Sequence, residues 1–240
     1  QDKVIVEEVE DGMLQISLSE AEVKFAGKAL GETVSLEVTP KNFGRIAAQK
    51  AKQVVVQKIR EEERKVLYDQ YYTKEHDIVT GMVQRYSNGN YNINIGKIDA
   101  ILTPQEQVKG EDFSAHERIK LYVTEVKDTP RGPRIIISRT HPELVKRLFE
   151  AEVAEIQSGV VEIKNVSREA GSRSKIAVYS NNPDVDAVGA CVGVNGARVN
   201  AIVNELRGEK IDIITWNENS AMMIENALSP AKVISVIADG

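Results

Sequence analysis

The sequence predicts a multidomain α+β protein, and three changes of pattern along its 240 residues predict it. Short strand signals up to residue 40 give way to apolar side chains at helical spacing over residues 42–70. Residues 76–140 then return to short strands separated by turn residues. Helical spacing alternates with strands from Pro142 onward. We expect modules over residues 1–75, 76–140 and 141–217, with a shorter piece over 218–240.

The first module combines a small sheet with a long helix. Apolar residues alternate on both sides of Asp11-Gly12, which predicts two strands joined by a hairpin-like turn. A third strand over residues 34–38 should stop at Pro40, because proline lacks the N–H that a strand ladder uses. The helix over 42–70 carries one apolar stripe at 3.6-residue spacing. The stripe contains Ile46, Ala47, Ala51, Val54, Val55 and Ile59.

The middle module is rich in short strands. Turn residues such as Asn88-Gly89, Pro104 and Gly110 separate them. Five short strands in a stretch of this length predict a small closed barrel. The strand signals cover residues 78–85, 91–95, 100–102, 118–126 and 135–138.

The last module follows the order helix, strand, strand, helix, helix, strand. Pro142 stands where a first helical residue is favoured, and Gly208 is a suitable residue to end a later helix. The elements after the first helix cover residues 160–166, 175–180, 184–192, 198–207 and 210–216. A helix over 221–228 and a strand over 232–237 then begin the same order again. We expect a truncated second copy of the module there.

Composition limits the class of protein. Apolar residues make up 42% and charged residues 28%, a balance typical of globular domains. The sequence has no apolar run long enough to span a membrane and no secretory signal. Cys191 is the single cysteine, so we expect a buried thiol in a reducing cytoplasm rather than a disulfide or a cysteine-based metal site. Because the chain starts with Gln1, we expect it to be cut from a longer one.

The charge is unevenly distributed. The net charge is −5, yet residues 41–58 contain five basic residues and no acidic one. Smaller basic stretches cover 127–139 and 164–175. Local basic patches on an acidic chain suit contact with phosphates or with an acidic protein surface, although any one of them could simply be a solvated face. The basic residues of the first stretch are Lys41, Arg45, Lys50, Lys52 and Lys58.

A short glycine-containing segment joins two predicted helices of the last module. Two glycines three residues apart let the backbone turn sharply and let a ligand approach closely. The next helix directs free N–H groups and its positive dipole end toward that loop, which favours sugar-phosphate. A P-loop is excluded, because no Gly-Lys-Ser/Thr follows and a helix precedes the loop. The segment reads Gly193, Val194, Asn195, Gly196, Ala197 and Arg198.

Placed in this order of elements, the glycine loop resembles that of a type II KH domain. In KH domains the loop clamps about four nucleotides of a single strand. The resemblance implies that the six residues from Gly193 to Arg198 bind RNA. A plain glycine-rich turn between helices is the alternative.

The middle module resembles an S1 domain, a relative of the oligonucleotide/oligosaccharide-binding barrels. The segments Gly81-Met82-Val83 and Gly89-Asn90-Tyr91 and the closing strand over 134–138 carry the resemblance. It implies that Tyr91 stacks on a base, with packing alone as the alternative role. It also implies RNA contacts by Lys127, Arg131 and Arg134. Asn88 and Thr103 depart from the family, which often has an aromatic residue and a histidine there.

The whole chain resembles the bacterial NusA family of transcription termination/antitermination factors. The resemblance is carried by the segments 38–49 and 54–60, by Val6-Glu7-Glu8-Val9, and by Gly196-Ala197-Arg198 with Ile211-Asp212-Ile213. Compared with the family, the chain lacks the first helices of the N-terminal domain and most of a second KH domain.

The NusA resemblance implies an RNA-binding factor that docks on RNA polymerase near the RNA exit. The S1 and KH modules would hold nascent single-stranded RNA and modulate pausing, termination and antitermination. We expect RNA polymerase, RNA and other termination or antitermination factors as partners, no membrane, and a monomer. The candidate polymerase contacts are Lys41, Arg45, Lys50 and Lys52.

No catalytic machinery is visible in the sequence, so we expect no enzyme, no cofactor and no metal. His76, His116 and His141 fall on separate elements without metal-ligand spacing. Three other readings remain open. The RNA-gripping region of an exoribonuclease would place KH before S1 and a large catalytic domain upstream. The others are a translation-associated RNA-binding protein and an interaction scaffold with an idle KH loop.

Overall fold

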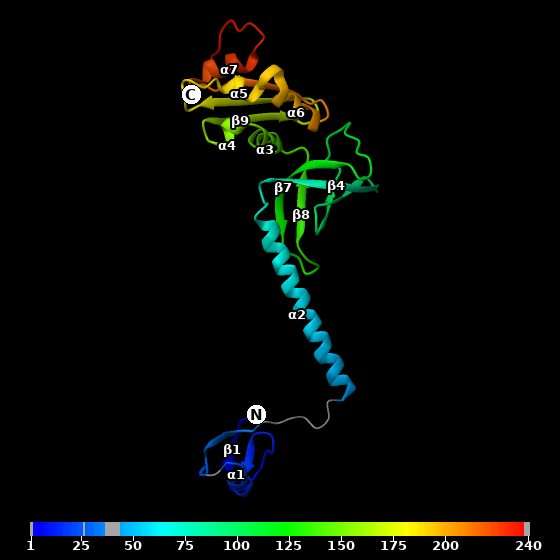
Figure 1. Cartoon of the computed structure of the whole chain (residues 1–240), viewed down its shortest axis with the longest axis vertical. Helices are drawn as coiled ribbons and strands as arrows, with labels where there is room; N and C mark the ends of the chain where they lie inside the picture. The colour runs from blue at the N-terminus through cyan, green and yellow to red at the C-terminus, as the bar shows by residue number, and fades with distance from the viewer. Residues whose placement is uncertain (1, 26, 37–43, 238–240) are drawn as a thin grey trace. The chain divides into compact units, whose positions relative to one another are not determined.

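The computed structural model describes residues 2–25, 27–36 and 44–237 (Figure 1). The chain divides into two compact units, Gln1–Ile59 and Arg60–Gly240. Each unit is described by itself.

The first unit contains a three-stranded sheet with strand order β2-β1-β3 and one short helix. Ile5, Ile16, Ala21 and Val34 form its buried core. Ser17 caps the helix, because its hydroxyl accepts the N–H of Glu20 at 3.3 Å. The elements are β1 (Asp2–Val6), β2 (Gln15–Ser17), α1 (Leu18–Lys24) and β3 (Thr33–Ser35).

The two strands and the turn predicted in this unit form, but the two strands do not pair with each other as a hairpin. A turn does form at Asp11, whose carboxylate accepts the N–H of Met13 at 2.8 Å. However, β1 and β2 pair in parallel, with Ile5 opposite Ile16, and β3 is the antiparallel neighbour of β1. Parallel pairing places both isoleucines in the core with Ala21 of α1. Leu18, expected in a strand, instead begins α1.

The long helix α2 (Arg45–Tyr72) confirms the predicted helix, although residues 42 and 43 lie outside the described residues. Its apolar stripe is exposed where the side chains are described: Val54, Val55 and Ile59 are all more than half exposed. The last turns of α2 belong to the second unit, where Leu67, Tyr68 and Tyr71 pack against a barrel.

The barrel has five antiparallel strands in the order β6-β5-β4-β7-β8. Asn88 and Gly89 both have positive φ, as a two-residue hairpin turn between β4 and β5 requires. The outer strands β6 and β8 lie next to each other without pairing in the sheet, so the barrel is nearly closed. This confirms the predicted barrel. Its strands are β4 (Ile78–Ser87), β5 (Asn90–Asn94), β6 (Asp99–Leu102), β7 (Arg118–Lys127) and β8 (Arg134–Ser138).

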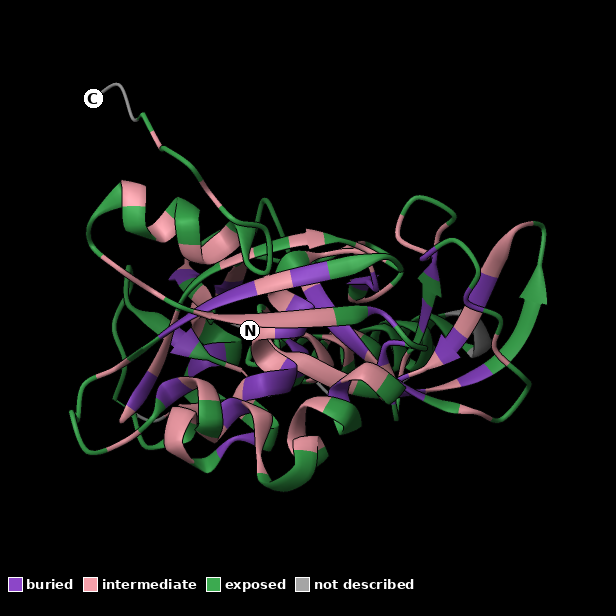
Figure 2. Cartoon of the chain, turned by 90° about the horizontal axis from the view of Figure 1, so that it is seen from above, coloured by how far each residue is buried: buried purple, intermediate pink, exposed green. Residues whose placement is uncertain are grey.

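The C-terminal domain has a three-stranded sheet in the order β11-β10-β9, with β10 and β11 parallel and β9 antiparallel. Phe149, Cys191 and Leu206 from three helices share one core with Ile176 and Val178 of β10. Figure 2 shows the buried residues of the chain in purple. The elements are α3 (Pro142–Glu152), α4 (Ala154–Gln157), β9 (Val161–Glu169), β10 (Arg173–Ser180), α5 (Ala187–Val192), α6 (Ala197–Glu205), β11 (Lys210–Thr215) and α7 (Ser220–Leu228).

The predicted order of helices and strands in this domain is confirmed, with two corrections. The first predicted helix is two helices, because the backbone of Val153 is extended between α3 and α4. The strand expected over 232–237 does not form in this structure.

A buried arginine joins the barrel to the C-terminal domain. Arg139 donates to Glu111 at 3.0 Å and to the Lys120 carbonyl at 2.9 Å on the barrel side. On the other side it donates to the carboxylate and the backbone carbonyl of Glu205, at 3.1 and 2.9 Å. The ring of Phe113 lies 5.5 Å from the guanidinium of Arg139 and 5.6 Å from that of Arg207. These contacts hold the two domains together.

Across the described ranges, none of the helices is both long and apolar enough to cross a membrane.

Candidate nucleic-acid interface

The glycine loop lies between α5 and α6, where the sequence predicts it. Gly193 and Gly196 have φ values of 74° and 76°, and Asn195 has a φ of 52°. Three left-handed residues within four positions turn the chain tightly and leave Val194 at the apex, 83% exposed. The backbone of the loop is therefore open to a ligand from outside.

Both glycines have a backbone conformation that favours glycine, and Gly193 also lacks room for a side chain. A Cβ on Gly193 would lie 2.8 Å from the Cγ of Arg198, and one on Gly196 would lie 3.1 Å from the amide nitrogen of Asn200. No side chain caps α6 at Gly196. The N–H of Ala197 donates to the carbonyl of Val194, and the N–H groups that follow in the first turn of this nine-residue helix have no side-chain cap at the loop.

Arg198 connects the loop to neighbouring helices through hydrogen bonds. Its guanidinium donates to the Glu155 carboxylate at 2.9 Å and to the carbonyl of Ala190 at 2.6 Å. It therefore ties α4 to the end of α5, and its charge is paired. Gly193, Val194, Asn195, Gly196 and Ala197 form the part of the predicted site that a ligand can approach directly.

The structure corrects the expected position of the aromatic surface on the barrel. Tyr91 is only 6% exposed and packs against Tyr86 and Phe113, with ring centroids 4.6 and 5.4 Å away. The packing role left open for Tyr91 is therefore the one the structure supports. Tyr86 is 61% exposed and presents the accessible ring. Tyr86 pairs with Tyr91 across β4 and β5, a register that the two-residue turn at Asn88-Gly89 sets, so this signal in the sequence could have identified it.

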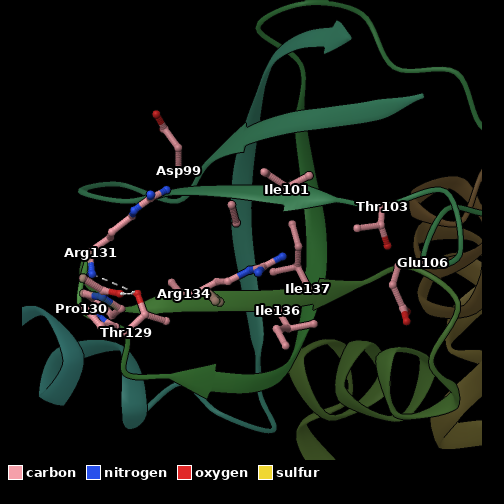
Figure 3. A pocket seen from close by; sticks show the side chains of 14 residues that line it. Asp99, Ile101, Thr103, Glu106, Thr129, Pro130, Arg131, Arg134, Ile136 and Ile137 are labelled. Atoms are coloured by element: carbon pink, nitrogen blue, oxygen red, sulfur yellow. Dashed lines mark hydrogen bonds between the residues drawn. The ribbon is translucent and has the colours of Figure 1, made fainter. Parts of the chain in front are cut away.

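The three basic residues predicted on the barrel separate into two environments. Lys127 ends β7 and pairs with Glu125 at 3.0 Å, with both side chains about half exposed. Arg131 and Arg134 line a groove of about 750 Å³ between β6 and β8 (Figure 3). Among the described residues, neither guanidinium has a hydrogen-bonding or ion-pair partner. These two charges are available to a ligand.

The loop that carries Arg131 is held in place. The Thr129 hydroxyl donates to the carbonyl of Gly132 at 2.6 Å, and Arg64 of α2 donates to the carbonyl of Pro130 at 2.6 Å. These hydrogen bonds fix the backbone on either side of Arg131 at one end of the groove.

The candidate polymerase contacts are only partly described. Lys50 and Lys52 are exposed on α2. Arg45 begins α2, but its side chain lies outside the described part, and so does Lys41.

Two of the three histidines contact the same tyrosine: the hydroxyl of Tyr122 lies 3.4 Å from Nδ1 of His76, and its ring stacks on that of His141 with centroids 4.7 Å apart. The Nδ1 of His141 accepts the N–H of Glu143 at 3.2 Å and caps α3. His76 and His116 both have positive φ at turns. Over the ranges that the structure describes, no three potential metal ligands come together.

Comparison with known proteins agrees with this architecture. A model of the NusA N-terminal domain matches residues 1–65, and a model of the NusA-like first KH domain matches residues 139–216. The Bacillus subtilis transcription termination/antitermination protein NusA is 54% identical over 237 residues, covering 99% of this chain and 64% of the relative.

Relatives from other bacteria carry the same name. Those of Halalkalibacterium halodurans and Thermus thermophilus are 54% and 40% identical, and each match covers 98% of this chain and 61% of the relative. The chain thus spans about three fifths of the length of these relatives. Their shared name denotes transcription termination/antitermination proteins. The matches to both domains and across nearly the whole chain place it in the NusA family.

Proposed function

We propose that this chain is an RNA-binding transcription elongation factor. It docks on bacterial RNA polymerase near the RNA exit, binds nascent single-stranded RNA, and modulates pausing, termination and antitermination. It acts in the cytoplasm as a monomer, with RNA polymerase and RNA as its partners.

The conformation of the glycine loop is the observation that carries this proposal. The loop has three left-handed residues, an exposed apex at Val194 and the uncapped start of α6 beside it. Such a site fits a sugar-phosphate backbone, because the glycines permit close approach and the helix end favours negative charge.

The barrel adds a second contact to the same strand. Arg131 and Arg134 offer free charges, and Arg139 holds the barrel against the KH domain. Two weak sites in a fixed arrangement bind one strand more tightly than either does alone, because the second contact forms at high effective concentration. Docking on polymerase raises the local RNA concentration further, and exposed Lys50 and Lys52 suit an acidic surface there.

The test is RNA binding by the Val194→Asp, Asn195→Asp double variant, measured by fluorescence anisotropy with an unstructured RNA at two salt concentrations. Two carboxylates at the loop apex should repel phosphate and weaken binding about tenfold or more, with a smaller salt dependence. Circular dichroism checks that the variant folds.

The matched control is Asn165→Asp with Ser167→Asp, which adds the same charge to exposed positions of β9 in the same domain. It should bind RNA nearly as the parent chain does. Equal loss in both variants would show a general charge effect and contradict a site at the loop.

A further inference from the structure

We infer that the groove between β6 and β8 is a binding slot for a guanine nucleotide of single-stranded RNA. This inference rests on the proposed function and adds a base preference to it. It places the base contact of the barrel between β6 and β8, which do not pair with each other, rather than on the exposed ring of Tyr86.

The walls of the groove are apolar and open to solvent. Ile101 of β6 is 48% exposed, and the half-buried Ile136 of β8 lies opposite it, with the buried Ile137 beneath (Figure 3). Pro130 and Pro133 add further apolar surface near the loop. A slot of this kind offers apolar contact to the faces of a flat base, whose burial against isoleucine and proline side chains is favourable.

The basic end of the groove suits the phosphate. Among the described residues, the guanidinium groups of Arg131 and Arg134 have no hydrogen-bonding or ion-pair partner. The carboxylate of Asp99 also lines this end of the groove, where it accepts hydrogen bonds from Gln84 and Asn94, and Arg134 extends along the groove toward Ile137 (Figure 3). Arginine recognises phosphate through two parallel hydrogen bonds. An apolar slot with two free arginines at one end matches a nucleotide, which joins an apolar base to an anion.

The opposite end carries a carboxylate. Glu106 and Thr103 line the groove there, and the backbone of Glu106 is fixed because its carbonyl accepts the N–H of Arg139 at 3.0 Å. One carboxylate oxygen of Glu106 accepts from the Thr140 hydroxyl at 3.2 Å, which orients the group. This bond also closes the end of the groove that lies away from the arginines.

A carboxylate only accepts hydrogen bonds. Guanine is the one RNA base with two adjacent donors, N1–H and the exocyclic amine, on its Watson–Crick edge. Adenine, cytosine and uracil place an acceptor beside their donor, and that acceptor would face the negative oxygens. Single-stranded bases are read on this edge. The Glu106 end of the groove therefore selects guanine.

The test compares short oligouridines that carry one central guanosine, inosine, adenosine or cytidine. The guanosine oligomer should bind the chain about tenfold more tightly than the adenosine or cytidine oligomer, a ratio typical of one bidentate base contact. Inosine lacks the exocyclic amine and should bind less tightly than guanosine.

The Glu106→Gln variant should lose this preference, because its amide presents one acceptor and one donor, and it should bind plain oligouridine as before. Glu125→Gln is the matched control, since Glu125 is about half exposed on β7 of the same barrel and does not line the groove. Guanosine preference that survives Glu106→Gln would overturn the inference.

Photocrosslinking with 6-thioguanosine locates the base independently. Adducts should map to peptides with Ile101 or Ile136, and adducts confined to Tyr86 or to the glycine loop would refute the slot. The two proposals fail differently. Absence of RNA binding contradicts the proposed function, whereas binding without base preference contradicts only the slot.

Discussion

Arg168 and Glu209 form an ion pair inside the KH domain, each with a side chain 1% exposed. Glu209 also accepts from the Ser174 hydroxyl at 2.6 Å and from the N–H of Gly171 at 2.9 Å. Burial raises the pKa of Glu209, but the hydrogen bonds from Arg168, Ser174 and Gly171 outweigh it, so the pKa lies below its ordinary value of 4.5. The pair thus links the start of β11 to the β9–β10 hairpin.

At neutral pH, Glu209→Gln should lower the free energy of unfolding by about 3–5 kcal/mol, because it leaves the Arg168 charge buried without its partner. A carboxylate with a lowered folded pKa stabilises above its unfolded pKa, and this contribution disappears as the pH falls through the folded pKa. The difference between parent and variant should therefore shrink below pH 4.5. Urea unfolding across this range measures it.

Glu218→Gln, at an exposed position of the same domain, is the control and should leave stability nearly unchanged. A Glu209 variant as stable as this control would contradict the structural role of the buried pair.

At the scale of elements, the end of α2 is attached to the barrel through one hydroxyl. The OH of Tyr71 donates to the carbonyl of Ile95 and accepts the N–H of Lys97 at 3.0 Å. The tyrosine ring is 7% exposed in the barrel core. The helix end and the β5–β6 turn are therefore held in register.

Tyr71→Phe should destabilise the second unit by about 1–3 kcal/mol, because it leaves a carbonyl and an N–H without their partner. The neighbouring Tyr72→Phe is a matched control, since Tyr72 is 55% exposed. Thermal unfolding followed by circular dichroism compares the two. Similar midpoints would show that the Tyr71 hydroxyl does not attach the helix.

Elements with strong local signals could be predicted from the sequence, whereas their partners could not. The helical period of α2 and the turn at Asn88-Gly89 are local properties, and both are confirmed. The parallel pairing of β1 with β2 brings Ile5 and Ile16 into one core with Ala21, and the burial of Tyr91 depends on its contact with Phe113, which lies far from it in the sequence. The glycine loop was predictable because its backbone conformation itself requires glycine.

At the scale of the whole second unit, Arg139 determines whether barrel and KH domain behave as one body. Its contacts to Glu111 and Glu205 join residues far apart in the sequence, and no local pattern reveals them. Tyr122 of β7 also packs in the KH core, so the modules could be predicted from the sequence but the contacts between them could not.

Arg139→Met should cost about 3–5 kcal/mol, since two carboxylates lose their buried partner. We also expect the barrel and the KH domain to unfold in separate transitions, observed by calorimetry. Arg118→Met, on an exposed position of β7, should keep the behaviour of the parent chain. A single unchanged transition in the Arg139 variant would show that other contacts suffice to join the domains.

The free edges of the outer strands β6 and β8 also affect how readily the chain associates with copies of itself. A free strand edge normally invites a strand from another molecule, which leads to aggregation. Here β6 and β8 turn their free edges toward each other, and Pro130, Pro133 and Arg134 surround the entrance to β8. Proline and arginine both discourage edge-to-edge pairing, so the groove can stay open without templating a fibril.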